Sequence, residues 1–332
     1  MKAHRLAGPF RGPLARGFDA FLAFRQDLAT CHEHVRVALH HLDRFLVQRG
    51  SDAHELTRPL LEEWLTTLAD RAPITRRNYF RVARQYCVFR ARADPTVFIP
   101  DAISCPRVTA RFRPYIYSEQ EIRALVKAAA HLSGTLRPHT YVTLLLLLYT
   151  TGLRIGEAIR LQLRDIDHDS AIVHVRAGKF RKARLVPMTA SLLARLDTYL
   201  QQRQRAGAPT HADAPLLWNP RRGAYSRVGV QHGISRLLRL VCGKRRGQRG
   251  RGPRVHDIRH AFAVHRLLRW YREGADVQAK LPLLATYLGH STFLSTQYYL
   301  TATPELLAEA SHRFHNGFGS VVRLLEELDD IR

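Results

Sequence analysis

The chain has 332 residues, which is more than one small domain needs and enough for two domains with separate cores. Its 52 lysines and arginines outnumber its 28 acidic residues, so the formal net charge is +24. A positive field of this strength attracts polyanions, among which nucleic acid is the commonest partner. The longest apolar run, Val142–Tyr149, is far shorter than the roughly 20 residues that span a bilayer, which argues against a membrane protein.

The start of the chain and its cysteines bear on the cellular compartment. No apolar stretch long enough for a signal peptide follows Met1, so a cytoplasmic protein is expected. The four cysteines lack C-x-x-C spacing, which favours free and mostly buried thiols over a zinc knuckle or a disulfide framework. They are Cys31, Cys87, Cys105 and Cys242.

The first hundred residues predict a tail followed by a helical domain. Residues 1–14 are basic and rich in proline and glycine without apolar periodicity, which predicts a flexible tail. Apolar residues then recur at helical spacing from Phe18 to about Ala93. About four amphipathic helices are expected, one of them with Thr57 as its N-cap, so that residues 15–100 form a small helical domain.

A linker and a second domain follow. Residues 101–116 combine prolines with several arginines, which predicts an extended basic linker. Ser118 and Glu121 form a capping-box pattern at the start of a helix, and the apolar run ending near Tyr149 predicts a buried helix after it. We therefore expect a second domain over residues 117–332.

Within this second domain the pattern changes to strand and back to helix. Residues 166–175 predict a turn entering a strand, and Arg184–Pro187 its partner, joined by a basic hairpin loop. Residues 243–253 predict a flexible loop. Further helices are expected at Ser191–Gln204, Val228–Val241, Asp257–Tyr271, Leu281–Leu288 and Pro304–Arg313. The predicted fold class is mainly α with a small β-hairpin or sheet (α+β).

Two motifs in this domain contain basic side chains that are suited to bind a phosphate group. Thr151–Glu157 reads T-G-L-R-I-G-E, and the planar guanidinium of Arg154 can grip two phosphate oxygens while Glu157 orients it. The hairpin Gly178–Pro187 contains Lys179, one of only six lysines in the chain. Each residue alone would suit a solvated surface position, so the evidence lies in the motif around it.

Two further motifs contain histidine, and two adjacent tyrosines complete the series. His256 and Arg259 lie three residues apart, on one helical face, so one phosphate can contact both. His290 follows Leu288-Gly289, and Tyr299 lies nine residues after it, next to Tyr298. Adjacent side chains of a helix point about 100° apart, so only one tyrosine can face a phosphate. A phenol has a pKa of ~10, so a tyrosine that attacks a phosphate at neutral pH needs help to lose its proton. Either nearby cations favour the phenolate, or another group takes the proton during the attack.

In order and spacing these motifs resemble those of the tyrosine recombinase (phage integrase) family, which cuts DNA through a 3′-phosphotyrosyl intermediate. The resemblance covers the whole second domain, as its catalytic domain, and the first domain more loosely resembles the family's helical core-binding domain. In the family a lysine protonates the leaving 5′ oxygen, a role that the resemblance gives to Lys179, with Lys182 as the fallback. Phe180 departs from the glycine that the family often has there, which would stiffen the turn. The implied catalytic residues are Tyr299 as nucleophile and Arg154, Lys179, His256, Arg259 and His290.

The resemblance implies a site-specific recombinase or integrase acting on double-stranded DNA, with transposition among its uses. It implies a homotetramer on two paired DNA sites and leaves room for accessory proteins. No cofactor is expected, because a phosphotyrosine ester retains the energy of the broken bond and rejoining requires no ATP. No metal is expected either, since the motif regions lack the carboxylates that hold Mg²⁺.

Three alternatives stay open on the sequence alone. A type IB topoisomerase uses similar chemistry as a monomer, although the hairpin and L-G-H motifs favour a recombinase. A catalytically idle DNA-binding regulator is disfavoured because all six candidate residues are present. His256 and His260 have the spacing of some zinc helices, but the glutamate of H-E-x-x-H is absent.

The residues beyond Tyr299 predict an amphipathic helical tail. Leu306, Leu307 and the segment 321–328 contribute its apolar side chains. This tail could dock on a neighbouring subunit or pack within its own chain, and the sequence favours neither.

Overall fold

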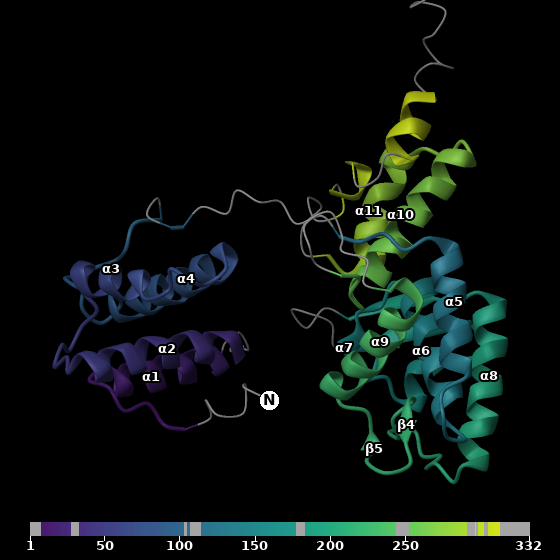
Figure 1. Ribbon diagram of the computed structural model, residues 1–332, viewed down its shortest axis with the longest axis horizontal. Coiled ribbons are helices and arrows are strands. Elements are labelled where there is room, and N and C mark those ends of the chain that lie inside the picture. The colour runs from purple at the N-terminus through teal and green to yellow at the C-terminus, as the bar shows by residue number, and fades with distance from the viewer. Residues whose placement is uncertain are drawn as a thin grey trace, which may run out of the picture. The chain divides into compact units, whose positions relative to one another are not determined.

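The computed structural model describes residues 8–27, 33–102, 105–106, 114–176, 183–243, 252–290, 296, 298–301 and 305–312. The chain divides into two compact units between Phe112 and Arg113, inside the segment 101–116 for which the sequence predicts a linker. Helices predominate and strands are short, in agreement with the predicted fold class (Figure 1). Among the described helices, none has both the length and the apolar character that crossing a membrane requires.

The first unit is a helical bundle, drawn in purple to blue in Figure 1. Its helices are α1 (Ala15–Asp27), α2 (Glu33–Arg49), α3 (Arg58–Thr66) and α4 (Pro73–Arg90). Thr57 is the N-cap residue of α3, as predicted, although its hydroxyl makes no capping hydrogen bond. Large side chains at helical spacing, including Phe18, Trp64 and Tyr86, form the core of this unit.

The segment before α1 differs from the predicted flexible tail over residues 1–14. Phe10 and Leu14 are buried in the core of the first unit. The carboxylate of Asp43 on α2 accepts hydrogen bonds from the backbone N–H groups of Arg11 (3.0 Å) and Gly12 (2.8 Å). Two buried apolar side chains and a buried carboxylate therefore hold residues 10–14 against the bundle.

The second unit contains most of the helices. These are α5 (Glu119–Ala130), α6 (Arg137–Thr151), α7 (Ile155–Ala158), α8 (Ala190–Arg205), α9 (Arg227–Cys242), α10 (Asp257–Arg272) and α11 (Val277–Leu288), with the 3-10 turns η3 (Leu163–Asp165) and η5 (Tyr298–Thr301). The capping box of Ser118 and Glu121 starts α5 as predicted. Helices α8, α9 and α10 match their predicted ranges to within one residue at each end. Helix α11 begins four residues before the predicted Leu281, because Asp276 caps it.

The strands form two small sheets. The larger is antiparallel, in the order β1 (Ile166–Asp167), β2 (Ile172–Val175) and β3 (Arg184–Pro187). Strands β2 and β3 are the predicted pair, with Val173 opposite Val186, whereas β1 was expected to be only a turn. A second pair, β4 (Trp218–Asn219) and β5 (Gly223–Ala224), was not predicted. The hairpin loop with Lys179 and Lys182 lies outside the described residues.

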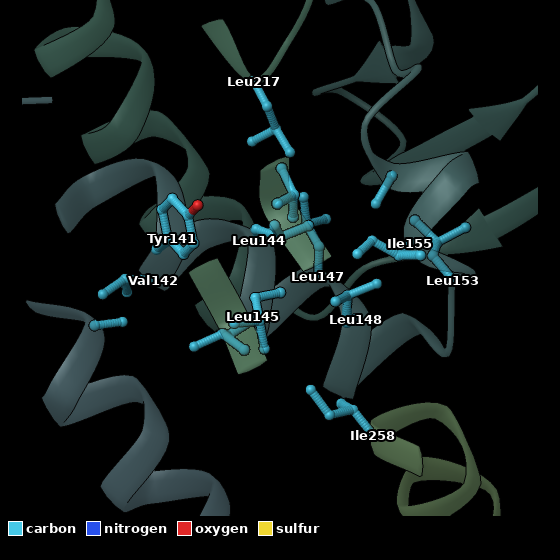
Figure 2. Close-up of a cluster of buried hydrophobic side chains, with 14 of the residues drawn as sticks. Tyr141, Val142, Leu144, Leu145, Leu147, Leu148, Leu153, Ile155, Leu217 and Ile258 are labelled. Atoms are coloured by element: carbon cyan, nitrogen blue, oxygen red, sulfur yellow. The ribbon is translucent and has the colours of Figure 1, made fainter. Parts of the chain in front are cut away.

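Helix α6 is the centre of the second unit. It is the apolar run that the sequence predicted to be buried, and it packs against α5, α8 and α10. Figure 2 shows Leu144, Leu147 and Leu148 of α6 in one cluster with Ile155 of α7 and Ile258 of α10. The same core therefore fixes the C-terminal end of α6 relative to the first turn of α10.

A smaller apolar cluster holds the tyrosine segment. Phe262 of α10, Leu281 of α11, Tyr299 of η5 and Leu306 are buried together in it. Residues 305–312 are helical, and Leu306 is fully buried within its own chain, whereas Leu307 is exposed. This part of the predicted tail therefore packs against its own chain. The amphipathic segment 321–328 lies outside the described residues.

Candidate active site

Arg154 stands where α6 ends and α7 begins. Gly152 terminates α6 with a positive φ of 61°, and Arg154 occupies the N-cap position of α7. Its guanidinium donates to Glu157 Oε1 (2.8 Å) and to the carbonyl oxygen of Gly289 (3.1 Å). Arg154 is thus held by two contacts, one with Glu157 on α7 and one with the backbone at the end of α11.

Glu157 connects Arg154 to the strand β3. Its side chain is only 2% exposed and pairs with two guanidinium groups. Arg184 of β3 donates to both carboxylate oxygens, at 3.2 and 2.8 Å, and also to the carbonyl oxygen of Tyr287 on α11 (2.8 Å). The carboxylate therefore joins α7, β3 and the end of α11 into one charged network.

The ionisation of Glu157 depends on this network. Burial alone would raise the pKa of its carboxyl group, but the hydrogen bonds and charges of Arg184 and Arg154 outweigh burial and lower that pKa to about 2. The carboxylate is therefore charged at neutral pH and neutralises part of the positive charge around it.

Replacing Gly152 with alanine is expected to lower the free energy of unfolding by about 2–4 kcal/mol. A Cβ at this position would lie 2.6 Å from Cδ1 of Phe262 and 2.9 Å from Cδ2 of Leu288. The positive φ costs a non-glycine residue about 1 kcal/mol, and overpacking adds about 1–3 kcal/mol. Urea unfolding followed by circular dichroism measures the change.

Gly207 provides a matched control for this substitution. It also has a positive φ, of 76°, but no atom lies within 4 Å of the Cβ that alanine would add. Gly207→Ala should therefore lose only the backbone contribution, about 1 kcal/mol. Equal losses at the two positions would contradict the packing argument at Gly152.

Arg259 and Tyr299 are the most deeply buried of the described candidate residues, each 2% exposed. The guanidinium of Arg259 donates to the carbonyl oxygens of Gly152 (2.6 Å) and Leu288. These carbonyls are at the C-terminal ends of α6 and α11, where unpaired acceptors and the helix dipole favour a positive charge. Burial, and then the charge of Arg154, lower the pKa of Arg259 to about 9, so it remains protonated at pH 7.

His290 follows a left-handed turn at the end of α11. Gly289 has a φ of 63°, and the N–H of His290 donates to the carbonyl oxygen of Ala285 (2.9 Å), which closes the helix. His290 Nδ1 lies 2.6 Å from the hydroxyl oxygen of Thr296, a fully buried side chain. The turn and this hydrogen bond together fix the orientation of the imidazole.

Tyr299 lies in η5, a 3-10 turn, instead of the α-helix that the sequence suggested. Its hydroxyl oxygen is 2.7 Å from Nδ1 of His260 on α10. The centre of its ring is 6.2 Å from that of His290, with the two rings stacked. Tyr298 belongs to the same turn, and its side chain lies outside the described residues.

The structure brings five of the six predicted site residues together. Arg154 and Arg259 bind adjacent carbonyls at the end of α11, immediately before His290. The ring centre of Tyr299 is 5.5 Å from that of His260 and 6.2 Å from that of His290, and the ring of His256 is 4.9 Å from that of His260. The sixth residue, Lys179, lies outside the described residues.

The histidines of this cluster are neutral at pH 7. Burial first, and then neighbouring cations with Arg259 among them, lower the pKa of His256, His260 and His290 to about 4 in each case. This holds even for His256, whose side chain is partly open to solvent. Each imidazole therefore has one N–H donor and one basic nitrogen.

Sequence reasoning missed three residues of this cluster. Arg184, His260 and Thr296 were given no catalytic role, although each stands inside or beside a motif. Arg184 is the arginine of the hairpin motif, His260 directly follows Arg259, and Thr296 precedes Tyr299 by three residues. Their positions in the sequence were visible, but the partners of Arg184 and His260 lie on distant elements, and that of Thr296 is six residues earlier in the chain.

Comparison with known proteins gives consistent relatives. Residues 116–305 match the family model described as the phage integrase family. The integrase/recombinase y4rB of Sinorhizobium fredii is 40% identical over 272 residues, which cover 80% of this chain and 85% of that protein. The tyrosine recombinase XerC of Bacillus licheniformis is 30% identical over 288 residues, covering 83% of this chain and 88% of that protein.

A solved structure with the same fold is the Tn1549 transposon integrase in complex with transposon right end DNA. It aligns with a TM-score of 0.66 at 16% identity, covering 90% of this chain and 99% of that chain. The low identity limits this likeness to the fold, which extends over both units.

Proposed function

This chain belongs to the phage integrase family, and from that premise we propose that Tyr299 is the nucleophile with which it cuts DNA. The chain is a site-specific recombinase of the tyrosine type, an enzyme that breaks and rejoins DNA strands. The observation that supports Tyr299 is its position, with its hydroxyl among the cluster of histidines and arginines. Attack by this hydroxyl on phosphorus would leave a 3′-phosphotyrosyl bond and a free 5′ end.

Arg154 and Arg259 are proposed to hold the attacked phosphate. A guanidinium has five N–H donors, and the carbonyl and carboxylate contacts of each arginine use only part of them. Two fixed positive charges stabilise the charge that develops on phosphorus in the transition state, and they cost no reorganisation when it forms.

The remaining roles go to His290, His256 and Lys179. If the Thr296 hydroxyl donates to His290 Nδ1, the proton of that imidazole is on Nε2, from which it can donate to a phosphate oxygen. His256 is proposed to donate to the same phosphate from the start of α10. Lys179 is proposed as the acid that protonates the leaving 5′ oxygen, with Lys182 as its substitute.

The partners proposed for the chain are double-stranded DNA and three further copies of itself. The net charge of +24 supports DNA binding through the phosphate backbone. We assign DNA core binding to the helical unit at residues 15–100 and catalysis to residues 117–332. A homotetramer on paired sites, accessory proteins and a cytoplasmic location complete the proposal.

Trapping the covalent intermediate tests this function. A duplex selected for binding from a random pool is nicked next to the cleavage site, so that a short 5′-hydroxyl fragment diffuses away and cleavage becomes irreversible. Digestion and mass spectrometry then identify the residue joined to DNA. We expect phosphate on Tyr299. An adduct on Tyr298, or no adduct with any selected duplex, would contradict the assignment, and the second result would support an idle DNA-binding regulator.

A further inference from the structure

The hydroxyl group of Tyr299 lies close to a basic nitrogen of His260. His260 Nδ1 lies 2.7 Å from Tyr299 Oη, within hydrogen-bonding distance, and the two residues come from α10 and η5. Tyr299 is 2% exposed, so bulk water has little access to its side chain. A phenol attacking phosphorus must lose its proton, and this nitrogen is close enough to accept it.

Four other described groups of the cluster are unsuited to accept that proton, and no hydrogen bond joins the fifth, His256, to Tyr299 in the described part of the site. Arg154 and Arg259 are cations without an acceptor atom. Glu157 is held by two guanidinium groups, and its pKa is lowered to about 2. His290 uses Nδ1 for the hydroxyl of Thr296. The cations can stabilise a phenolate, but they leave the transfer of the proton to another group.

We propose that His260 is a catalytic residue that accepts the proton of Tyr299 during strand cleavage and returns it during rejoining. In cleavage, the bond between Tyr299 Oη and phosphorus forms, the bond from phosphorus to the 5′ oxygen breaks, and the phenol proton moves to His260 Nδ1. The 5′ oxygen takes a proton from the acid assigned to Lys179. Rejoining reverses each transfer. This inference rests on the proposed nucleophile, because it has no meaning unless Tyr299 attacks DNA.

The electrostatics of the site fit this role. Burial, and then Arg259 and Arg254, lower the pKa of His260 to about 4, so the imidazole is neutral and basic at pH 7 in the DNA-free protein. A bound phosphate brings negative charge beside it and raises that pKa, which makes proton acceptance easier at the moment of attack. The titratable and charged groups that face His260 are Arg254, His256, Arg259, His290 and Tyr299.

The variant H260N separates proton acceptance from positioning. The asparagine Oδ1 can occupy nearly the place of Nδ1 and accept the hydrogen bond of Tyr299, but an amide is not a base. We expect H260N to bind DNA normally and to form the Tyr299 adduct about 10²–10⁴-fold more slowly. Its rate should rise with pH as the phenol ionises, whereas the wild-type rate levels off once His260 is deprotonated. A wild-type rate, or a slower rate with an unchanged pH profile, would overturn the proposal.

A second substrate distinguishes His260 from the leaving-group acid. When sulfur replaces the bridging 5′ oxygen, the leaving group departs as a thiolate and needs no proton. Lys179→Ala should regain activity on this substrate, and H260N should stay slow, because its defect lies in the nucleophile. Recovery of H260N would overturn the assignment. If H260N does not fold, H260Q takes its place in both assays.

The chain offers a matched control on the same helix. His265 also lies within hydrogen-bonding distance of a tyrosine, with Nδ1 2.8 Å from Tyr149 Oη, but its partner lies outside the cluster around Tyr299. H265N should leave the cleavage rate unchanged. Wild-type protein that forms no adduct on Tyr299 would refute the proposed function itself. A normal wild-type adduct together with a normal H260N rate would refute only the role of His260.

Discussion

Replacing Tyr299 with phenylalanine is expected to reduce the covalent protein–DNA adduct below detection while DNA affinity stays within about threefold, or about 0.7 kcal/mol. The substitution removes the attacking oxygen and with it the hydrogen bond to His260. The ring remains in the apolar cluster with Leu281 and Leu306, so the unfolding free energy should fall by only about 1 kcal/mol. Denaturing gel electrophoresis of labelled DNA measures the adduct, and a band-shift titration measures affinity.

Tyr298→Phe is the control for this experiment, because it makes the same chemical change one residue away. It should form the adduct at the wild-type rate. Two outcomes would count against the assignment. An adduct in the Tyr299 variant would show that another residue attacks DNA, and a loss of DNA binding would show that Tyr299 is structural.

Replacing Glu157 with glutamine is expected to lower the free energy of unfolding by about 3–5 kcal/mol and the cleavage rate by about 10²-fold. Glutamine keeps the shape of the side chain but removes the charge between Arg154 and Arg184. Arg184, with a side chain only 7% exposed, would then be a buried cation without its counter-charge. Arg154 would lose its carboxylate partner and no longer be held for phosphate. Urea unfolding and the adduct assay measure the two effects.

Glu63 provides the control, since its ion pair with Arg49 is at the surface, with both side chains 46% exposed. Glu63→Gln should change the unfolding free energy by less than about 1 kcal/mol. The pH dependence gives a further check at Glu157. Because its pKa is lowered from 4.5 to about 2, its contribution is complete above pH 4.5 and declines as the pH falls toward 2. The difference between wild type and Glu157→Gln should shrink over that range, and a constant difference would contradict the ion-pair explanation.

Many helices of the second unit could be predicted because the sequence signals that start and end them are local. A capping box, an apolar run and a glycine at a helix end each depend on residues within one or two turns, and the predicted ranges of α8, α9 and α10 agree closely with the structure. The candidate residues were found in the same way, from short motifs. Five of them lie together, although the sequence gives no distance between Arg154 and Tyr299.

What could not be predicted depends on contacts between distant segments. Arg184 stood in a recognisable hairpin motif, but its partners Glu157 and Tyr287 are far away in the chain. His260 could be seen only as the residue after Arg259 and as one that has, with His256, the spacing of some zinc helices. In the first unit, composition suggested a flexible tail, whereas burial of Phe10 and Leu14 determines the structure there. A proline- and glycine-rich composition excludes regular helix more reliably than it excludes packing.

The carbonyl oxygens that hold the two arginines belong to helix ends, Gly152 after α6 and Leu288 and Gly289 at the end of α11. The positions of the two arginines therefore depend on where these two helices end, and little on the length of the chain that connects them. Doubling the length of a flexible surface loop costs roughly 0.6 kcal/mol in loop-closure entropy. Insertions or deletions in those connections should therefore leave the positions of the two arginines nearly unchanged.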